Sequence, residues 1–304
     1  MKTMRIPLYV ALGLAILGVV LGSFFDLNIS TAIANPRSTF GLLISAIGPT
    51  IGFAGVAVMG GGLIAYAQKD YPVVLKVFFY IFAAACYGVS IMYPGAEYFG
   101  ENGFYWVAPK FVGYLIVAIP EAAAMVGGYF LFRNCENKNM WIIFFIIIGL
   151  LLIALLAVIP TLKDMIHRPR YRLVSVKDEV EFHNWWEPCK NYKDLIKQYD
   201  LSNEDFKSFP SGHTAEASIL LVVSTFFPMA SKKFEKYQLP AFICSFLLVA
   251  LVALARIMAA AHFLSDVSMG ASITLLLVTI ANEVVIRIKS LHIEDQQAQA
   301  EPQE

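Results

Sequence analysis

The chain has few charged residues for its length. Only 15% of its 304 residues are charged, whereas 58% are hydrophobic. This balance leaves too much apolar surface for an ordinary soluble domain, so we expect a bilayer to surround most of the chain. The formal net charge is zero and no long basic run occurs. The composition therefore gives no support to binding of nucleic acid.

Cysteine is scarce and scattered. Cys86 and Cys244 fall in apolar stretches, while Cys135 and Cys189 lie in polar stretches without the short spacings of paired or metal-binding cysteines. The cysteine pattern therefore predicts no disulfide framework and no zinc site. We expect no metal and no cofactor elsewhere in the chain.

Long apolar stretches recur along the chain. A spanning helix needs about 20 mainly apolar residues. Eight stretches approach that length, at residues 6–25, 40–67, 72–93, 111–132, 140–161, 211–229, 239–258 and 264–288. We therefore predict an all-α polytopic membrane helix bundle with about eight transmembrane helices. The first stretch is treated as a membrane helix because no convincing small-residue cleavage site follows it.

Two features inside the apolar stretches have competing explanations. Glu121 and Pro120 lie near the middle of the fourth stretch, where a charge is costly. Glu121 could be a carboxyl paired or protonated within the bundle, or a catalytic group. Glycine patches occur at residues 60–62 and 127–128, and close helix packing explains them better than a nucleotide-binding loop, because no strand precedes them.

The distribution of lysine and arginine predicts the orientation, because short cytoplasmic loops carry an excess of these residues. With the N-terminus inside, the cytoplasmic side receives Lys2, Arg5, Lys69, Arg133, Lys138, Lys232, Lys233, Lys236, Arg287 and Lys289. The outer side then receives residues 94–110, residues 162–210 and the connection around His262.

Three parts of the chain differ in composition. Residues 1–139 form the N-terminal transmembrane helices, and residues 140–290 form a predicted catalytic core that includes the polar outer loop 162–210. Residues 291–304 are rich in Gln, Ala and acidic residues, which predicts a disordered cytoplasmic tail.

The first polar cluster follows the fifth apolar stretch. It contains four cations, namely Lys163, Arg168, Arg170 and Arg172. Guanidinium groups match phosphate oxygens bidentately, and a lysine adds a point charge. A basic patch that contacts lipid headgroups is the alternative, although the positive-inside trend does not call for cations on the outer face.

The second cluster is the run from Phe209 to Thr214, at the start of an apolar stretch. Pro210 and Ser211 are typical of a helix start, and Gly212 would let an anion approach the free backbone N–H groups there. His213 would stand beside that anion and could give a proton to a leaving oxygen. The alternative is an ordinary helix cap followed by an interfacial histidine.

The third cluster joins Arg256, His262 and Asp266. His262 and Asp266 are four residues apart, so one helical turn would place them on one face. A carboxylate can then hold one imidazole nitrogen as N–H and leave the other free to attack phosphorus. Arg256 would reach the same site only if the chain bends near residues 259–261. The alternative is a buried structural His–Asp pair with Arg256 at the interface.

All three clusters lie on the same predicted side of the membrane. Together they supply cations for phosphoryl oxygens, a nucleophile and an acid for the leaving group, which are the parts that phosphoryl transfer needs. A metal ion is not required by this set.

These motifs resemble those of the type 2 phosphatidic acid phosphatase (PAP2) superfamily, in its membrane-bound lipid phosphatase branch. The pattern Lys, six residues, Arg-Pro corresponds to Lys163 through Arg170, and Pro-Ser-Gly-His is Pro210 to His213. The pattern Ser-Arg, five residues, His, three residues, Asp runs from Arg256 to Asp266. Two residues depart from the family pattern without removing a catalytic group: Tyr171 replaces Pro and Ala255 replaces Ser.

The resemblance implies a role for each residue. His262 would form a phosphohistidine, Asp266 would orient it, and His213 would protonate the leaving group. The phosphoryl oxygens would be bound by Lys163, Arg170, Ser211, Gly212 and Arg256. Membrane members usually have a six-helix core with three helices before the first motif, whereas five stretches precede it here. The extra pair leaves the active-site side unchanged but could cover or reshape the lipid entrance.

The sequence thus predicts a metal-independent lipid phosphatase in a bacterial inner membrane, with its active site on the outer face. Its substrate and partner would be a phosphorylated lipid, such as phosphatidate, phosphatidylglycerol phosphate or a polyprenyl diphosphate. A non-enzymatic carrier or scrambler of such lipids and a lipid phosphotransferase are the alternatives. The outer loop with Trp185 and Trp186 could be a lid, a headgroup-selecting loop or a solvated connector.

Overall fold

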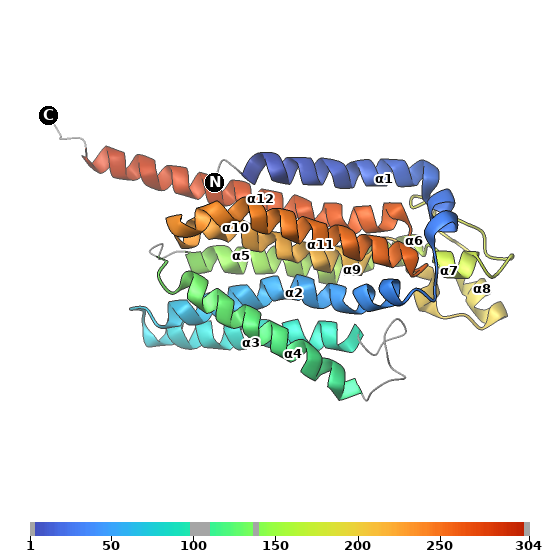
Figure 1. Cartoon of the computed structure of the whole chain (residues 1–304), viewed down its shortest axis with the longest axis horizontal. Helices are drawn as coiled ribbons and strands as arrows, with labels where there is room; N and C mark the ends of the chain where they lie inside the picture. Colours follow the sequence, from blue (N-terminus) through green and yellow to red (C-terminus); the bar gives the residue numbers. More distant parts are fainter. Residues whose placement is uncertain (1–3, 98–109, 136–139, 301–304) are drawn as a thin grey trace.

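The computed structural model describes residues 4–97, 110–135 and 140–300 of the chain. These residues form helices and connecting segments and contain no β-strand. The long helices run side by side in one bundle, and α7 and α8 lie together at one end of it (Figure 1). The predicted all-α bundle is confirmed. Most of the predicted outer segment 94–110, with Lys2 and Lys138, lies outside the described residues.

Seven helices within the described ranges are long and apolar enough to cross a membrane. Each has an apolar run, as the sequence predicted, and the protein is therefore an integral membrane protein. They are α1 (Arg5–Ile33), α2 (Thr39–Ala67), α3 (Val73–Glu97), α4 (Lys110–Phe132), the column of α5 (Met140–Ile153), η2 (Ala154–Val158) and α6 (Ile159–Ile166), then α11 (Gln238–Met258) and α12 (Leu264–Ala300).

The eighth predicted helix is present in three short pieces. These are α9 (Gly212–Ala217), the 3₁₀ turn η4 (Ser218–Leu220) and α10 (Leu221–Ala230), which follow one another without a gap. The Ser218 hydroxyl donates to the Thr214 carbonyl oxygen at 2.7 Å, a back-bond that bends helices. We call these three pieces the α9–α10 column. Because the column adds one crossing to the seven long helices, α1 begins and α12 ends at the same end of the bundle (Figure 1).

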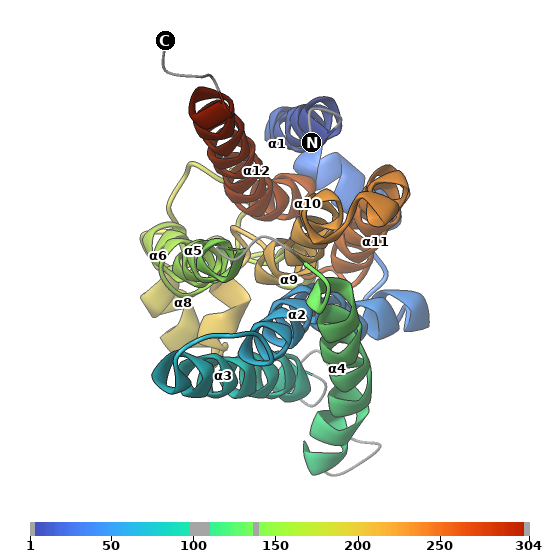
Figure 2. The ribbon, with the colours of Figure 1, turned by 90° about the vertical axis from the view of Figure 1, so that its left-hand side faces the viewer.

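Helix α2 lies in the middle of the bundle, as the view along the helices shows (Figure 2). Its glycines allow close approach of its neighbours. A Cβ on Gly61 would lie 1.8 Å from the Met125 carbonyl oxygen of α4, and one on Gly52 would lie 1.9 Å from the Glu216 carbonyl oxygen of α9. Packing therefore explains Gly61 of the first predicted patch, whereas Gly127 of the second has no atom within 4 Å of an added Cβ. The contact at Gly52 sets the position of α9.

Gly52→Ala is expected to destabilise the protein by about 1 to 3 kcal/mol, because the added methyl group must displace the α9 backbone. Gly127→Ala on α4 is the matched control, since no atom lies within 4 Å of its added Cβ. Thermal unfolding in detergent measures both. Equal melting temperatures for the two variants would contradict the close contact of α2 with α9.

The predicted outer loop is a small folded unit. It contains α7 (Tyr171–Val174), α8 (Tyr192–Tyr199) and the 3₁₀ turn η3 (Asn203–Phe206). Its own apolar core consists of Leu173, Val180, Cys189, Leu195 and Phe206. A segment with a core holds its polar residues in fixed places, which a solvated connector does not.

Helix α12 continues to Ala300, whereas the sequence predicted a disordered tail over residues 291–304. Gln, Ala and Glu favour helix, and a preceding helix removes the cost of nucleation. Residues 301–304 lie outside the described part. The division of the chain at residues 139 and 290 remains a prediction.

Candidate active site

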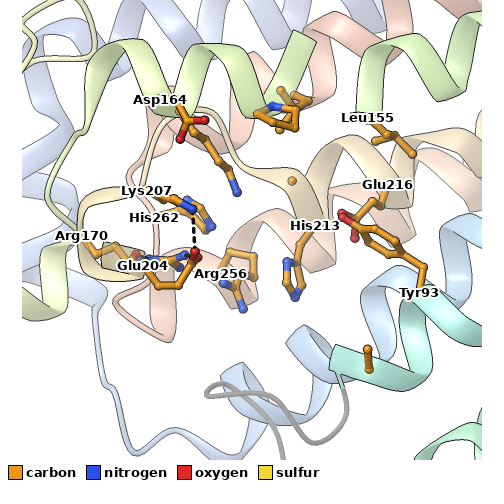
Figure 3. Close-up of a pocket in the computed structure, with 15 residues that line it drawn as sticks. Tyr93, Leu155, Asp164, Arg170, Glu204, Lys207, His213, Glu216, Arg256 and His262 are labelled. Atoms are coloured by element: carbon orange, nitrogen blue, oxygen red, sulfur yellow. Dashed lines mark hydrogen bonds and ion pairs between the residues drawn. The ribbon is translucent and has the colours of Figure 1, made fainter. Parts of the chain in front are cut away.

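A cavity of about 440 Å³ opens at the end of the bundle that carries α7 and α8. It is partly apolar, with Tyr93 and Ala96 of α3 and Leu155, Ile159 and Pro160 of the α5–α6 column in its lining. The rest of the lining is polar and comprises Lys163, Asp164, Arg170, Glu204, Lys207, Gly212, His213, Glu216, Arg256 and His262 (Figure 3).

The structure brings the three predicted clusters together at this cavity. Every residue predicted for the site lines it except Ser211 and Asp266, which are fully buried close behind the lining. The residues come from α6, α9, α11 and the connections between them, so their meeting depends on the tertiary fold. Glu121 is fully buried in α4 and lies outside the lining.

The turn at the end of α6 sets the positions of the residues in the first cluster. His167 adopts a left-handed conformation with φ of 48°, so the helix ends there and the chain turns. Lys163 and Arg170 line the cavity, and Arg170 is 4% exposed. The Arg170 Nε donates to the Glu204 carbonyl oxygen at 2.7 Å. The outer unit therefore holds this guanidinium at the cavity.

The second cluster forms the start of α9, as predicted. The Ser211 hydroxyl accepts from the Thr214 N–H at 3.4 Å and caps the helix. A Cβ on Gly212 would lie 3.3 Å from Glu216 Oε1 and 3.6 Å from Lys163 Nζ, so the glycine keeps open the space beside these two groups. A phosphoryl oxygen placed there would meet the Lys163 ammonium group and the backbone.

The third cluster includes the predicted bend. Helix α11 ends at Met258, and Ala260 has a positive φ of 55°. The turn brings Arg256 and His262 to the same cavity although a continuous helix would separate them.

The hydrogen bonding of His262 differs from the expectation. Its Nδ1 donates to the Ser208 carbonyl oxygen at 2.6 Å, while the nearest Asp266 oxygen is 3.8 Å away. Asp266 instead accepts from the Ser208 hydroxyl at 2.5 Å and from the Phe263 N–H at 2.8 Å. Ser208 therefore contacts both side chains, His262 through its carbonyl oxygen and Asp266 through its hydroxyl. Asp266 acts on His262 through Ser208 and also directly by its charge, across 3.8 Å.

This arrangement fixes the tautomer of His262. A carbonyl oxygen can only accept, so Nδ1 carries the hydrogen and Nε2 has the lone pair. Burial lowers the pKa of His262 well below its usual value, the nearby Asp266 carboxylate opposes this, and the charges of Arg170 and Arg256 lower it further. A neutral imidazole with a free nitrogen is the form that can attack phosphorus.

Charged residues beyond the predicted set also line the cavity. Lys207 Nζ donates to Glu204 Oε1 at 2.9 Å, and Arg170 Nη2 lies 3.8 Å from Glu204 Oε2. Burial raises the pKa of Glu204, but the hydrogen bond from Lys207 and the neighbouring cations outweigh it, so the net pKa is lowered. The sequence placed Glu204 and Lys207 in a polar loop with no pattern to single them out.

Two further residues have remote partners that the sequence did not reveal. Arg168 was one of four cations in the first cluster, but it is fully buried and pairs with Asp26 of α1 and Asp266 of α12. Asp26 follows the first apolar stretch, and only the rarity of a carboxylate in a membrane helix could have drawn attention to it.

The remaining aromatic and histidine residues of the outer unit lie away from the cavity lining. Trp185 Nε1 donates to the Ser23 hydroxyl of α1 at 2.9 Å and its ring stacks on Phe209. His167 stacks on Tyr192 with ring centroids 3.6 Å apart. Within the described ranges, no group of three or more His, Cys, Asp or Glu side chains could hold a metal ion.

Comparison with known protein families gives one clear result. A family model described as the PAP2 superfamily matches residues 139–289. The matched region contains the three clusters, the outer unit and the column of α9 and α10. Comparison with curated proteins and with solved structures finds no match.

Proposed function

Because this chain belongs to the PAP2 superfamily, a superfamily of phosphatase type, we propose that it is a metal-independent membrane phosphatase that hydrolyses a lipid phosphate. The observation that supports this most strongly is the convergence of three cations and two histidines on one cavity. The cations are Lys163, Arg170 and Arg256, and the histidines are His213 and His262.

In the proposed reaction, His262 Nε2 attacks phosphorus as the bond from phosphorus to the lipid oxygen breaks. The leaving oxygen takes a proton from His213, which leaves a phosphohistidine and a neutral His213. A water molecule then attacks the phosphohistidine and gives a proton to His213, which releases phosphate and restores both histidines. Lys163, Arg170 and Arg256 neutralise the phosphoryl oxygens throughout.

The two-part lining supports a lipid substrate. Leu155 and Ile159 of the α5–α6 column and Ala96 of α3 give the cavity an apolar wall within the bundle. Farther from the cavity, α3 and α5 are packed together, with Phe82 and Phe145 ring centroids 4.7 Å apart. We therefore place the entrance for the hydrocarbon chain between α3 and the α5–α6 column.

The distribution of basic residues supports a site on the outer face. Arg5 and Lys69 lie at one end of the bundle, and the cavity lies at the other. Under the positive-inside trend the cavity then faces away from the cytoplasm. In a bacterial inner membrane it would accept phosphatidate, phosphatidylglycerol phosphate or a polyprenyl diphosphate from the outer leaflet.

Phosphate release from a panel of these three lipids, with a metal chelator present, tests the proposal in detergent-purified protein. Chelator-resistant release from at least one lipid is expected, and glycerol 3-phosphate without a lipid chain should be a poor substrate. Lipid binding without release would favour the carrier. A new phospholipid formed when an acceptor alcohol is added would indicate phosphotransfer.

The pH dependence of kcat/KM is expected to reflect the environment of His262, which faces Arg170, Arg256, His213 and Asp266. Since the pKa of His262 is lowered, the nucleophile stays neutral into mildly acidic solution. Activity attributable to His262 should be lost only as the pH falls through a value below about 6.5, the ordinary histidine pKa. A loss centred above that value would contradict the buried environment.

A further inference from the structure

A carboxylate from outside the matched family region reaches the active-site end of the bundle. Asp26 lies on α1, which packs along α12 in both views of the ribbon (Figures 1 and 2). The two backbones touch, because a Cβ on Gly22 would lie 2.5 Å from the Ser265 nitrogen. This close approach buries Asp26, which is 2% exposed, against the first turn of α12.

Asp26 and Asp266 share one arginine. Arg168 Nη2 donates to Asp26 Oδ2 at 2.9 Å, and Arg168 Nη1 donates to Asp266 Oδ1 at 2.6 Å. Asp26 also accepts from the backbone N–H of Ser265 at 2.9 Å and from the Ser265 hydroxyl. All four side chains are buried, so these hydrogen bonds have little competition from water.

The same network continues to the histidine. Asp266 Oδ2 accepts from the Ser208 hydroxyl at 2.5 Å, and the Ser208 carbonyl oxygen accepts from His262 Nδ1 at 2.6 Å. A continuous series of contacts therefore runs from Asp26 through Arg168, Asp266 and Ser208 to His262. Hydrogen-bond partners that lie behind a reactive side chain, as these lie behind His262, fix its orientation.

The second carboxylate exceeds what charge balance requires. Asp266 alone would neutralise Arg168, whereas Asp26 adds another negative charge from a separate helix. With carboxylates on two sides, the guanidinium has one orientation, and both Arg168 and Asp266 are held in place.

We propose that Asp26 is a positioning residue for the His262 nucleophile, acting through Arg168 and Asp266. The proposal rests on the proposed phosphatase function and extends its site to α1, which precedes the matched residues 139–289. It also gives α1, the first helix of the bundle, a role in the reaction.

Asp26→Asn in the full-length, detergent-purified protein tests this role, because the amide keeps the shape and removes the charge. We expect kcat to fall by about tenfold or more, on the scale seen for outer partners of functional groups, with KM changed by less than about twofold. Ser265→Ala removes a partner of Asp26 without changing charge, and should give a smaller loss in the same direction.

A second readout does not depend on turnover. The rate at which diethyl pyrocarbonate modifies His262, resolved by peptide mass spectrometry, follows the neutral imidazole. Loss of the Asp26 charge should destabilise the protonated form, so the midpoint of this reaction should move to lower pH. The other groups that face His262, namely Arg170, Arg256, His213 and Asp266, are unchanged in the variant.

Ser23→Ala is the matched control on α1, because it removes the hydrogen bond to Trp185 and leaves Asp26 intact. It should leave kcat and the modification midpoint unchanged. If Asp26→Asn has the kcat and the modification midpoint of the natural protein, the positioning role is wrong. It is also wrong if Asp26→Asn loses no more activity than Ser23→Ala does and its modification midpoint does not move. If the natural protein releases no phosphate but the midpoint still moves, the phosphatase proposal fails, while the coupling of Asp26 to His262 is supported.

Discussion

His262→Ala is expected to reduce phosphate release from every lipid substrate by at least about 10⁴-fold, the scale of losing a covalent nucleophile. The residue lies at the cavity with its Nδ1 committed to the Ser208 carbonyl oxygen, which leaves Nε2 for phosphorus. Lys163, Arg170 and Arg256 remain in the variant, so lipid binding should persist. Initial-rate assays and a lipid-binding measurement separate the two effects.

His183→Ala provides the control for this variant. His183 belongs to the outer unit and lies outside the cavity lining. The His183 carbonyl oxygen, which accepts from Arg168 Nε at 2.8 Å, stays in place when the side chain is removed. Hydrolysis should therefore stay within about threefold of the natural protein. Full activity of His262→Ala on any lipid that the natural protein cleaves would exclude a histidine nucleophile at this position.

His213→Ala is expected to show a loss that depends on the leaving group. For an alkyl phosphate the rate should fall by about 10² to 10⁴-fold, the usual contribution of general acid catalysis. For an aryl phosphate with an acidic phenol, which departs without a proton, the first step should be nearly unaffected. His213 stands at the cavity beside Gly212, on the first turn of α9.

The size of the phenol burst measures this first step directly in His213→Ala. A burst that survives with the aryl substrate while alkyl hydrolysis is lost would assign the acid role to His213. An equal loss with both kinds of substrate would instead assign it to binding or to the local fold. His262→Ala should show no phenol burst with the aryl substrate, because no phosphohistidine can form.

The sequence could indicate many of the residues that meet at this cavity, because their local spacing forms recognisable patterns. Lys163 and Arg170 share one short segment, Gly212 and His213 share a helix start, and His262 lies four residues from Asp266. The apolar periods of the helices likewise depend on local composition. Even the bend near residues 259–261 followed from the need to bring Arg256 to the same point.

The contacts that join these segments could not be predicted, because they depend on tertiary packing. The Ser208 carbonyl oxygen lies closer to His262 Nδ1 than Asp266 does, and Asp26 meets Arg168 across 142 positions of the chain. The 3₁₀ turn in the eighth helix begins at Ser218, whose hydroxyl donates to the Thr214 carbonyl oxygen. Periodic patterns in the sequence do not indicate such contacts.

Trapping the covalent intermediate tests the central claim most directly. Protein mixed with a lipid carrying ³²P in its terminal phosphate would be quenched in alkali, in which phosphohistidine survives, and then digested and mapped. The account predicts label on the peptide that contains His262, formed before phosphate release and absent from His262→Ala. Rapid phosphate release with no labelled protein, or label on another residue, would contradict it.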